Sequence, residues 1–377
     1  MDDNDYVKYL SIVDKWSPEM SRKYVESHTE TLNIKNEGKD PGKMKKCESA
    51  EDDFIKAASR GELKILLQLI SRISVDTQNS SGQTALISAS LSGCVAAVRF
   101  LIAKHANVEI ADHTGNCALH HACLKDNVSI LKFLLDKMNP NIKNKDGKSI
   151  LHLAVKFEKY QVLDYLIKSS NKINFNDQDG DGNTAVHIAI ANQNEKLLLK
   201  LLTIQTDLSL YNKDGLNPIN LAIVRDELEF LKLLLNTPSG FKVLQNKTLS
   251  KESNFQMAVR SKYNGIIDFL LNIHDSCIVT SEIDEKYGYT CLHWATLQIN
   301  KSLIEKILNK NPKLINVYDT HKLTVLEHVV NMYEKSKNNQ RTIIDIAIIL
   351  ITYDADIDLI ENRSGLKKLI KDILKRS

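Results

Sequence analysis

This sequence contains few of the features that mark membrane or nucleic-acid-binding proteins. Aromatic residues make up only 6% of the chain, which disfavours a surface that stacks nucleic-acid bases. The formal net charge is only +3 over 377 residues, so electrostatics give no reason to invoke nucleic acid or a membrane surface. No apolar run approaches the ~20 residues that a helix needs to span a bilayer. The sequence therefore predicts neither nucleic-acid binding nor a membrane span.

Cysteine is also sparse, and no two cysteines form a C-x-x-C pair. The six lie far apart, at Cys47, Cys94, Cys117, Cys123, Cys277 and Cys291. Such spacing is typical of free thiols, most of them buried, in a reducing compartment. The first residues, MDDNDYVKYL, are acidic and polar and do not resemble a secretory signal peptide. We therefore expect a cytoplasmic protein, with the nucleus as the alternative.

Familiar catalytic motifs are missing as well. The chain has no P-loop, no Gly-rich kinase loop, no G-x-S-x-G and no H-E-x-x-H. We therefore expect a protein that is not an enzyme and that needs no cofactor.

What the sequence does contain is one short pattern that returns many times. GQTALISA begins at Gly82 and is followed by GNCALHHA, GKSILHLA, GNTAVHIA and GLNPINLA, and later by GYTCLHWA from Gly288. The first five glycines, at 82, 115, 147, 182 and 215, are 33, 32, 35 and 33 residues apart. Weaker copies begin at Ser253 and Lys322, and residues 54–67 resemble a helix pair without its turn. A fixed period of this size predicts stacked supersecondary units.

The period near 33 and the T-P-L-H-x-A-like core resemble the ankyrin-repeat family over roughly residues 50–360. The resemblance implies an all-α fold, an ankyrin-repeat solenoid of stacked helix-turn-helix units with β-hairpin-like turns. We count about nine units, with degenerate first and last units, as terminal repeats must present a polar outer face. We expect a polar N-terminal tail at residues 1–49, the repeat array at 50–361 and a basic capping helix at 362–377.

The residues of one unit have structural reasons for their places. Gly147 and Gly215 follow Lys-Asp, where a tight turn requires positive φ. Thr184 can cap the first helix by accepting a hydrogen bond from a free backbone N–H. Leu151 begins the apolar stripe of such a helix and Ala154 continues it one turn later. One unit cannot cover this apolar face alone, so the units must stack.

Histidine recurs at one place in four units, as His120, His152, His187 and His293. The resemblance implies that this side chain hydrogen-bonds across to the turn backbone. His120, His121 and Cys123 could suggest zinc, but two of the three belong to the repeated pattern. No second ligand pair lies at zinc spacing, so we expect no zinc site.

Residues 177–183 resemble the start of a calcium-binding EF-hand loop. Asp177, Asp179 and Asp181 fall at positions one, three and five, and Gly182 falls at position six. The twelfth residue is Ile188, which cannot supply the bidentate carboxylate that closes the coordination sphere. The same residues fit the repeat register with one lengthened turn, so we expect a turn and no bound metal.

Several segments depart from the repeat. Insertions at 236–252, 273–286 and 333–341 are expected to be tolerated surface loops, with partner contacts as the alternative. Residues 5–16 have helical apolar spacing, which favours a helix that caps the first unit or a linear motif read by a partner. Residues 366–376 have the same spacing with a basic outer face, which favours a capping helix over a basic patch.

Ankyrin proteins are overwhelmingly binders, so the resemblance implies a non-catalytic scaffold or adaptor for a protein partner of unknown identity. We expect it to be monomeric. One alternative is a cytoplasmic inhibitor of Rel/NF-κB-type transcription factors, since residues 179–194 resemble a long-turned middle repeat of that family. The chain lacks that family's D-S-G-x-x-S phosphodegron and acidic Pro-rich tail. A ubiquitin-ligase substrate adaptor is the other alternative, although no box motif is recognisable.

Partner contacts in a repeat array concentrate at hairpin tips and on the concave face of the first helices. The expected tip contacts are Thr114, Asn116, Lys145, Lys148, Asn183, Lys213 and Leu216. The expected concave-face contacts are Lys125, Asp126, Phe157, Glu158, Gln193, Arg225 and Asp226. Phe157 and Leu216 stand out, because exposed apolar residues can anchor a partner.

Overall fold

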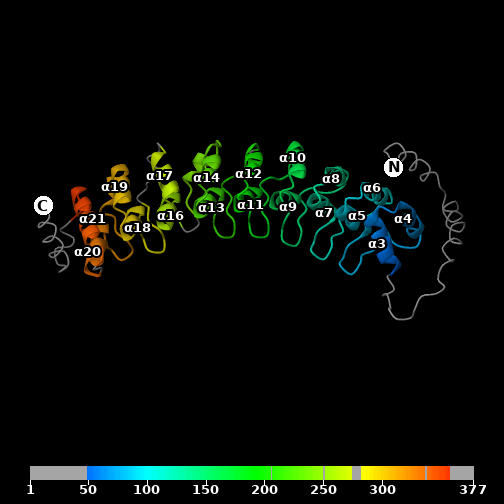
Figure 1. Ribbon diagram of the computed structural model, residues 1–377, viewed down its shortest axis with the longest axis horizontal. Coiled ribbons are helices and arrows are strands. Elements are labelled where there is room, and N and C mark those ends of the chain that lie inside the picture. Colours follow the sequence, from blue (N-terminus) through cyan, green and yellow to red (C-terminus); the bar gives the residue numbers. More distant parts are fainter. Residues whose placement is uncertain (1–48, 205, 249–250, 274–281, 336–337, 357–377) are drawn as a thin grey trace. The chain divides into compact units, whose positions relative to one another are not determined.

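The computed structural model describes residues 49–204, 206–248, 251–273, 282–335 and 338–356 (Figure 1). This part of the chain is helical, and its only β-structure is two isolated bridges, Gln78 to Thr84 and Ala111 to Cys117. Both bridges close a turn in the way expected of hairpin-like connections. The predicted helix at 5–16, nearly all of the predicted tail and the predicted capping helix at 362–377 lie outside the described residues.

Nine helix pairs follow one another along the described chain (Figure 1). The first helices are α3 (Ala50–Arg60), α5 (Ala85–Ser92), α7 (Ala118–Leu124), α9 (Ile150–Lys156), α11 (Ala185–Ala191), α13 (Pro218–Val224), α16 (Asn254–Ser261), α18 (Cys291–Leu297) and α20 (Val325–Lys335). The second helices are α4 (Leu63–Leu69), α6 (Val95–Ala103), α8 (Val128–Leu135), α10 (Tyr160–Lys168), α12 (Glu195–Leu202), α14 (Leu228–Leu235), α17 (Asn264–Asn272), α19 (Lys301–Lys310) and α21 (Gln340–Thr352). The predicted all-α repeat fold and its nine units are confirmed.

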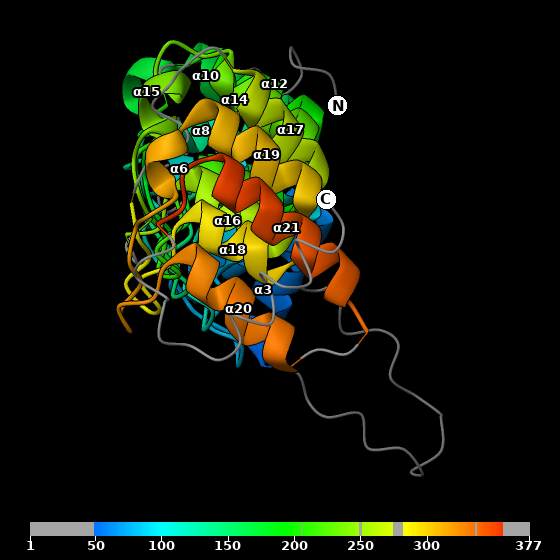
Figure 2. The ribbon, with the colours of Figure 1, turned by 90° about the vertical axis from the view of Figure 1, so that its left-hand side faces the viewer.

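The described residues form two compact units. The first unit contains the described residues up to Lys125 together with Lys132–Met138. The second unit contains Asp126–Leu131 and the described residues from Asn139 onward. In the first unit α3 packs on α5, and α5 packs on α7. In the second unit the first helices pack in order from α9 to α20, and Figure 2 shows α16, α18 and α20 side by side. Stacking of neighbours therefore covers the apolar faces in both units.

Small residues let the first helices approach one another closely. Leu151 and Ala154 of α9 are buried, as are Val186 and Ala189 of α11. The second helices supply bulk, as with the buried Leu163 and its counterparts on neighbouring repeats. Each large apolar side chain removed from water contributes roughly 1.5–3 kcal/mol. No helix of the described residues is long and apolar enough to cross a bilayer.

A left-handed residue follows each first helix from α3 to α18 and turns the chain into the second. Gly61 and Gly93 fill this place in the first two pairs. Glu158, Gln193 and Asp226 fill it later, with φ of 55°, 53° and 58°. Non-glycine residues in this region of φ are uncommon and carry a modest strain, which the surrounding packing must offset. These positions therefore have a structural role that the sequence pattern did not reveal.

The insertion at 236–252 is more than the predicted surface loop. It contains a short helix, α15 (Gly240–Leu244), whose Val243 and Leu244 are buried. A Cβ atom at Gly240 would lie 2.0 Å from the carbonyl oxygen of Leu234, so the segment packs tightly against the end of α14. The prediction of a tolerated loop is wrong here, because the insertion adds apolar side chains to the core. Of the other two insertions, residues 274–281 and 336–337 lie outside the described residues.

Candidate functional site

The turns between repeats are organised by one polar side chain each. Its oxygen accepts hydrogen bonds from the backbone N–H groups two and four residues further on. This arrangement occurs at Asn79, Asp112, Asn144, Asp179, Asn212 and Asp319. The expected glycines have positive φ, from 67° at Gly288 to 81° at Gly115, and Lys322 has φ of 57° at the same place in the last unit. The turn residues are therefore committed to holding the backbone.

The calcium-like stretch is one of these turns. Oδ1 of Asp179 accepts the backbone N–H groups of Asp181 and Asn183, both at 2.9 Å. Asp177 forms an ion pair with Lys143 at 3.1 Å. The N–H of Gly180 donates to the carbonyl oxygen of Asp146 in the preceding turn at 2.8 Å. The aspartates and glycines thus have structural partners, and the described residues contain no group of three or more His, Cys, Asp or Glu side chains placed to hold a metal ion.

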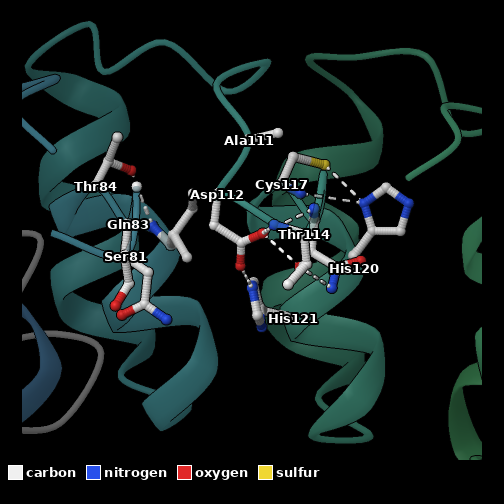
Figure 3. A network of polar contacts seen from close by, with 12 residues as sticks. Ser81, Gln83, Thr84, Ala111, Asp112, Thr114, Cys117, His120 and His121 are labelled. Carbon is white, nitrogen blue, oxygen red and sulfur yellow. Dashed lines mark hydrogen bonds and ion pairs between the residues drawn. The ribbon is translucent and has the colours of Figure 1, made fainter. Parts of the chain in front are cut away.

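His121, the histidine that lies outside the repeated pattern, contacts the aspartate that organises the turn at Asp112 (Figure 3). Oδ2 of Asp112 lies 2.8 Å from Nε2 of His121, and Oδ1 accepts the N–H groups of Thr114 and Asn116. Burial raises the pKa of Asp112, but the hydrogen bonds from Thr114 and His121 outweigh it, so the pKa is lowered overall. The carboxylate therefore remains charged and holds both the turn and the ring. His121 is engaged by Asp112 and not by a zinc-like cluster.

Two of the recurrent histidines act as the resemblance implied. The N–H of Ser149 donates to Nδ1 of His152, so Nε2 carries the proton and donates to the carbonyl oxygens of Asp177 and Asn183, both at 3.1 Å. Nε2 of His187 donates in the same way to the carbonyl oxygen of Leu216 at 3.0 Å. Burial lowers the pKa of both rings, so they are neutral near pH 7. Each neutral ring fastens one repeat to the next turn.

His293 lies in a different environment, which is made of rings. It stacks on Tyr289 with centroids 5.5 Å apart, and the His328 ring meets it edge-on at 5.6 Å. Burial lowers the pKa of His293 to about 4, and the nearby His328 adds to the effect. His328 is itself held by Asp319, with Nε2 2.9 Å from Oδ2. Ring packing therefore accompanies the interaction of His293 with the Leu323 backbone.

The structure brings several predicted tip residues of the second unit together. Lys145 and Lys213 are exposed, and Lys148 and Asn183 are half-buried. The N–H of Lys213 donates to the carbonyl oxygen of Asp181, and the Asn212 amide donates to Oδ1 of Asn183 at 3.0 Å. Adjacent hairpins are thus fixed side by side. In the first unit, the Asn116 amide donates to the exposed Thr114 hydroxyl at 2.8 Å.

Leu216 does not have the exposure that its position predicted. It is half-buried, its N–H donates to Asn212, and its carbonyl oxygen receives His187. These hydrogen bonds fix its backbone in the turn. The expectation that Leu216 is fully exposed is therefore wrong, and its role as a partner contact stays a prediction.

The helix-end residues divide into structural and exposed groups. The carboxylate of Asp126 accepts the N–H of Val162 at 2.9 Å, which is a structural use of a predicted contact. Phe157 is 47% exposed where α9 ends. The side chain of Gln193 donates to Glu227, and Arg225 donates to the carbonyl oxygen of Ala191 at 3.3 Å. The remaining predicted contacts of this group, Lys125, Glu158 and Asp226, are exposed at their helix ends.

The sequence prediction missed an aromatic group around α18. Tyr287, Tyr289 and Trp294 lie in mutual contact, with Trp294 edge-on to both tyrosines. Beside them lies a hollow of about 400 Å³ lined by Glu252, Arg260, Asp284, Glu285, Lys286, Tyr287 and Trp294. Three aromatic residues within residues 287–294 stand out in a chain that is 6% aromatic. That local enrichment was the signal that could have found the group.

Comparison with known families and proteins gives a consistent result. A family model for ankyrin repeats (3 copies) matches residues 54–146, and one for ankyrin repeats (many copies) matches residues 151–202. The chain is 32% identical over 187 residues to the nuclear factor NF-kappa-B p110 subunit of Drosophila melanogaster, over 45% of this chain and 19% of that protein. It is 38% identical over 81 residues to putative ankyrin repeat protein L92 of Acanthamoeba polyphaga mimivirus, over 21% of this chain and 20% of that protein.

A putative ankyrin repeat protein of Rickettsia felis is 27% identical over 125 residues, which are 32% of this chain and 41% of that protein. The matches thus span about a fifth of the first two relatives and less than half of the third. The residues matched by the family models cover the helix pairs from α3 to α12, apart from the first residues of α3 and α9.

Proposed function

This chain is an ankyrin-repeat protein, and on that premise we propose that it is a non-catalytic scaffold or adaptor that holds a protein partner. Ankyrin repeats are generally protein–protein interaction modules and are typically non-catalytic. The partner contacts the hairpin tips and the exposed ends of the first helices. The observation that carries this proposal is the exposed ring of Phe157 among polar helix-end residues.

The surroundings of Phe157 resemble the anatomy of a small binding surface. The Lys156 ammonium lies 5.7 Å from the centroid of the Phe157 ring. On the next repeat the Asn192 amide donates to the Lys156 carbonyl oxygen at 3.1 Å, and beyond it Arg225 contacts Ala191. Large exposed aromatic residues with a polar rim are enriched among the residues that dominate binding energy. We therefore expect Phe157 to anchor the partner and the polar residues around it to exclude water.

Affinity purification with mass spectrometry from the native cell tests this proposal. The full chain and its Phe157→Ala variant serve as baits, and circular dichroism checks that both are folded. Leu199→Ala is the matched control, since Leu199 is 46% exposed but lies on a second helix, α12. We expect Phe157→Ala to weaken binding of the captured partner about tenfold or more, and Leu199→Ala to leave it unchanged. Equal binding by the Phe157 variant would remove this surface from the proposal.

A second candidate is an inhibitor that binds Rel/NF-κB-type transcription factors in the cytoplasm. It is favoured by the similarity to the p110 subunit over 187 residues and by the resemblance of residues 179–194 to a long-turned middle repeat of that family. A pull-down with a purified Rel-type transcription factor distinguishes the two candidates. Binding would support the inhibitor, and capture of cullin machinery in place of a Rel protein would favour a ubiquitin-ligase adaptor.

We also propose that the chain works in the cytoplasm as a monomer. Cys94, Cys117 and Cys291 are free thiols, as is usual in a reducing compartment. Cell fractionation locates the protein, and light scattering during size-exclusion chromatography measures its mass in solution. A mass near 42.6 kDa is expected, and twice that value would contradict the monomer.

A further inference from the structure

Three turns of the chain start with a buried aspartate that receives a ring N–H from the following first helix. Asp112 lies 2.8 Å from His121, and Asp319 lies 2.9 Å from His328. At Asp284 the ring belongs to Trp294, whose indole N–H donates to Oδ2 at 3.2 Å. Histidine can carry a positive charge and indole cannot. Asp112 and Asp319 therefore each face a ring that can become positively charged. Asp284 faces a ring that donates a hydrogen bond but always stays neutral.

Asp284 is 7% exposed, and its remaining contact is the backbone N–H of Tyr287 at 2.6 Å from Oδ1. No lysine, arginine or histidine of the described residues forms an ion pair with it. The Arg260 guanidinium interacts with Asp284 electrostatically but donates its hydrogen bonds to Glu252. A buried carboxylate that forms no ion pair gains from a cation that can donate to it directly. Each carboxylate oxygen has capacity for a second hydrogen bond.

Asp284 borders the hollow described above, which lies beside the packed helices α16 and α18. Of the other charges in its lining, Glu252 is neutralised by Arg260, with two hydrogen bonds of 2.8 and 3.1 Å. Glu285 is exposed and pairs with Lys251 at 2.6 Å. Asp284 is thus the carboxylate of the lining that forms no ion pair among the described residues, although the Arg260 guanidinium also interacts with it electrostatically. An entering cation would meet it directly.

The aromatic rings at the hollow suit the same kind of ligand. Trp294 meets Tyr287 at an interplanar angle of 80° and Tyr289 at 81°, so the rings form a corner. Tyr287 is 37% exposed, and its face already holds the ammonium of Lys286, 4.8 Å from the ring centroid. Aromatic faces attract cations through their quadrupole, and a lysine on a flexible stem can leave the ring when another cation arrives.

We propose that this hollow, which we call the Asp284 hollow, receives an arginine side chain from an extended segment of a protein partner. The guanidinium group donates to the Asp284 carboxylate and lies against Tyr287, displacing Lys286. A planar guanidinium suits this place better than an ammonium, because it both pairs with a carboxylate and stacks on aromatic rings. The inference rests on the proposed scaffold function and names the chemistry by which one part of the surface recognises its partner.

Fluorescence of Trp294 in the full chain tests the proposal directly. The chain has two tryptophans, so the Trp16→Phe variant makes Trp294 the sole reporter. The probe is a capped pentapeptide with a central arginine flanked by glycines, and its comparison has citrulline, the neutral isostere, at the centre. We expect a saturable change in Trp294 emission with the arginine peptide and binding at least about tenfold weaker with the citrulline peptide.

Asp284→Asn supplies the decisive variant. Asparagine starts the corresponding, one residue shorter turns at Asn79, Asn144 and Asn212, and its amide oxygen can still accept the Tyr287 N–H. Asp179→Asn is the matched control, since Asp179 is 8% exposed at the start of its own turn and is not part of the hollow. We expect Asp284→Asn to weaken arginine-peptide binding at least about tenfold and Asp179→Asn to leave it unchanged.

Three results would overturn the Asp284 hollow. They are an absence of binding at millimolar peptide, equal binding of the citrulline peptide, or an equal loss in the two asparagine variants. None of them bears on capture of a partner through Phe157, which the cell-based experiment measures separately. Failure of the hollow and failure of the scaffold proposal are therefore distinguishable.

Discussion

Two stretches of the second unit build the same repeat by different means. In residues 144–235, which we call the regular segment, neutral histidines donate to the backbone of the next turn. In residues 248–330, which we call the aromatic segment, Tyr289, His293 and His328 pack ring against ring. The helix pairs are alike in both, so the repeat fold tolerates a change in what joins neighbours. Ring packing takes part in joining neighbouring repeats in the aromatic segment, whereas hydrogen bonds to the backbone join them in the regular segment.

The two segments also differ in what acts on the buried histidine. At His152 and His187, burial lowers the pKa while the backbone carbonyls and Asp179 oppose it. At His293 the Leu323 backbone, Asp319 and Asp284 also oppose burial, but the neighbouring His328 reinforces it, and the pKa falls to about 4. Protonation of the buried histidine therefore costs most free energy at His293, and the pH dependence of unfolding can measure this difference.

Leucine truncation is expected to have the largest effect, and it should be equal in the two segments. Leu151 and Leu292 hold the same buried place in α9 and α18. Either substitution by alanine should lower the free energy of unfolding by roughly 2–5 kcal/mol, since each leaves a cavity. Urea unfolding followed by circular dichroism measures the loss. A loss at Leu292 far below that at Leu151 would show that the aromatic segment is loosely packed.

Acid should weaken the aromatic segment more than the regular segment. A folded-state pKa of about 4 at His293, against about 6.5 in the unfolded chain, gives stability that is fully present above pH 6.5 and is lost as the pH falls to 4. The loss is on the order of 3 kcal/mol. His152 and His187 contribute in the same direction.

Urea unfolding of the Trp16→Phe chain between pH 7 and 4.5, followed by Trp294 fluorescence, measures this loss. His293→Gln should flatten the pH dependence more than His187→Gln does. An equal flattening would mean that His328 adds nothing to burial.

Turn substitutions should have smaller effects, with opposite signs in the two segments. A Cβ at Gly147 would lie 2.5 Å from the backbone nitrogen of Gly180, and φ there is 71°. Gly147→Ala should therefore cost about 2 kcal/mol, through strain and a displaced neighbouring turn. Lys322 has φ of 57° at the same turn position, so Lys322→Gly should stabilise the chain by about 1 kcal/mol or less.

Thermal unfolding midpoints of these two variants check both signs. A stabilising Gly147→Ala would contradict the close approach of the two hairpins. A strongly destabilising Lys322→Gly would show that the lysine side chain supports its turn.

The fold could be predicted from the sequence because its signal is repeated in register. A glycine every 33 or so residues and a Leu-His-x-Ala-like core indicated the helix pairs and the positive φ at the glycines, and the resemblance to ankyrin repeats implied the role of His152 and His187. These features depend on local turn chemistry and a simple apolar period, both of which are readable from one chain.

Other features depend on contacts between distant residues and escaped the sequence. Helix α15 adds Val243 and Leu244 to the core although no period marks them. Leu216 was expected to be exposed because of its turn position, but it is half-buried, and its backbone is held by Asn212 and His187. The Asp284 hollow joins Glu252, Arg260 and Trp294 from two repeats, and no pattern within one repeat predicts that meeting.

Backbone hydrogen bonds connect each hairpin of the regular segment to the one before it. The N–H of Gly180 donates to the carbonyl oxygen of Asp146, and the N–H of Lys213 donates to that of Asp181. Each turn therefore offers a carbonyl to its successor and an amide to its predecessor. If a gene gains or loses one whole repeat, every turn amide still has a carbonyl of the preceding turn to donate to. If it gains half a repeat, one turn amide and one turn carbonyl lose their hydrogen-bond partners. Growth by whole-repeat duplication is thus the route by which such a molecule can lengthen without refitting its neighbours.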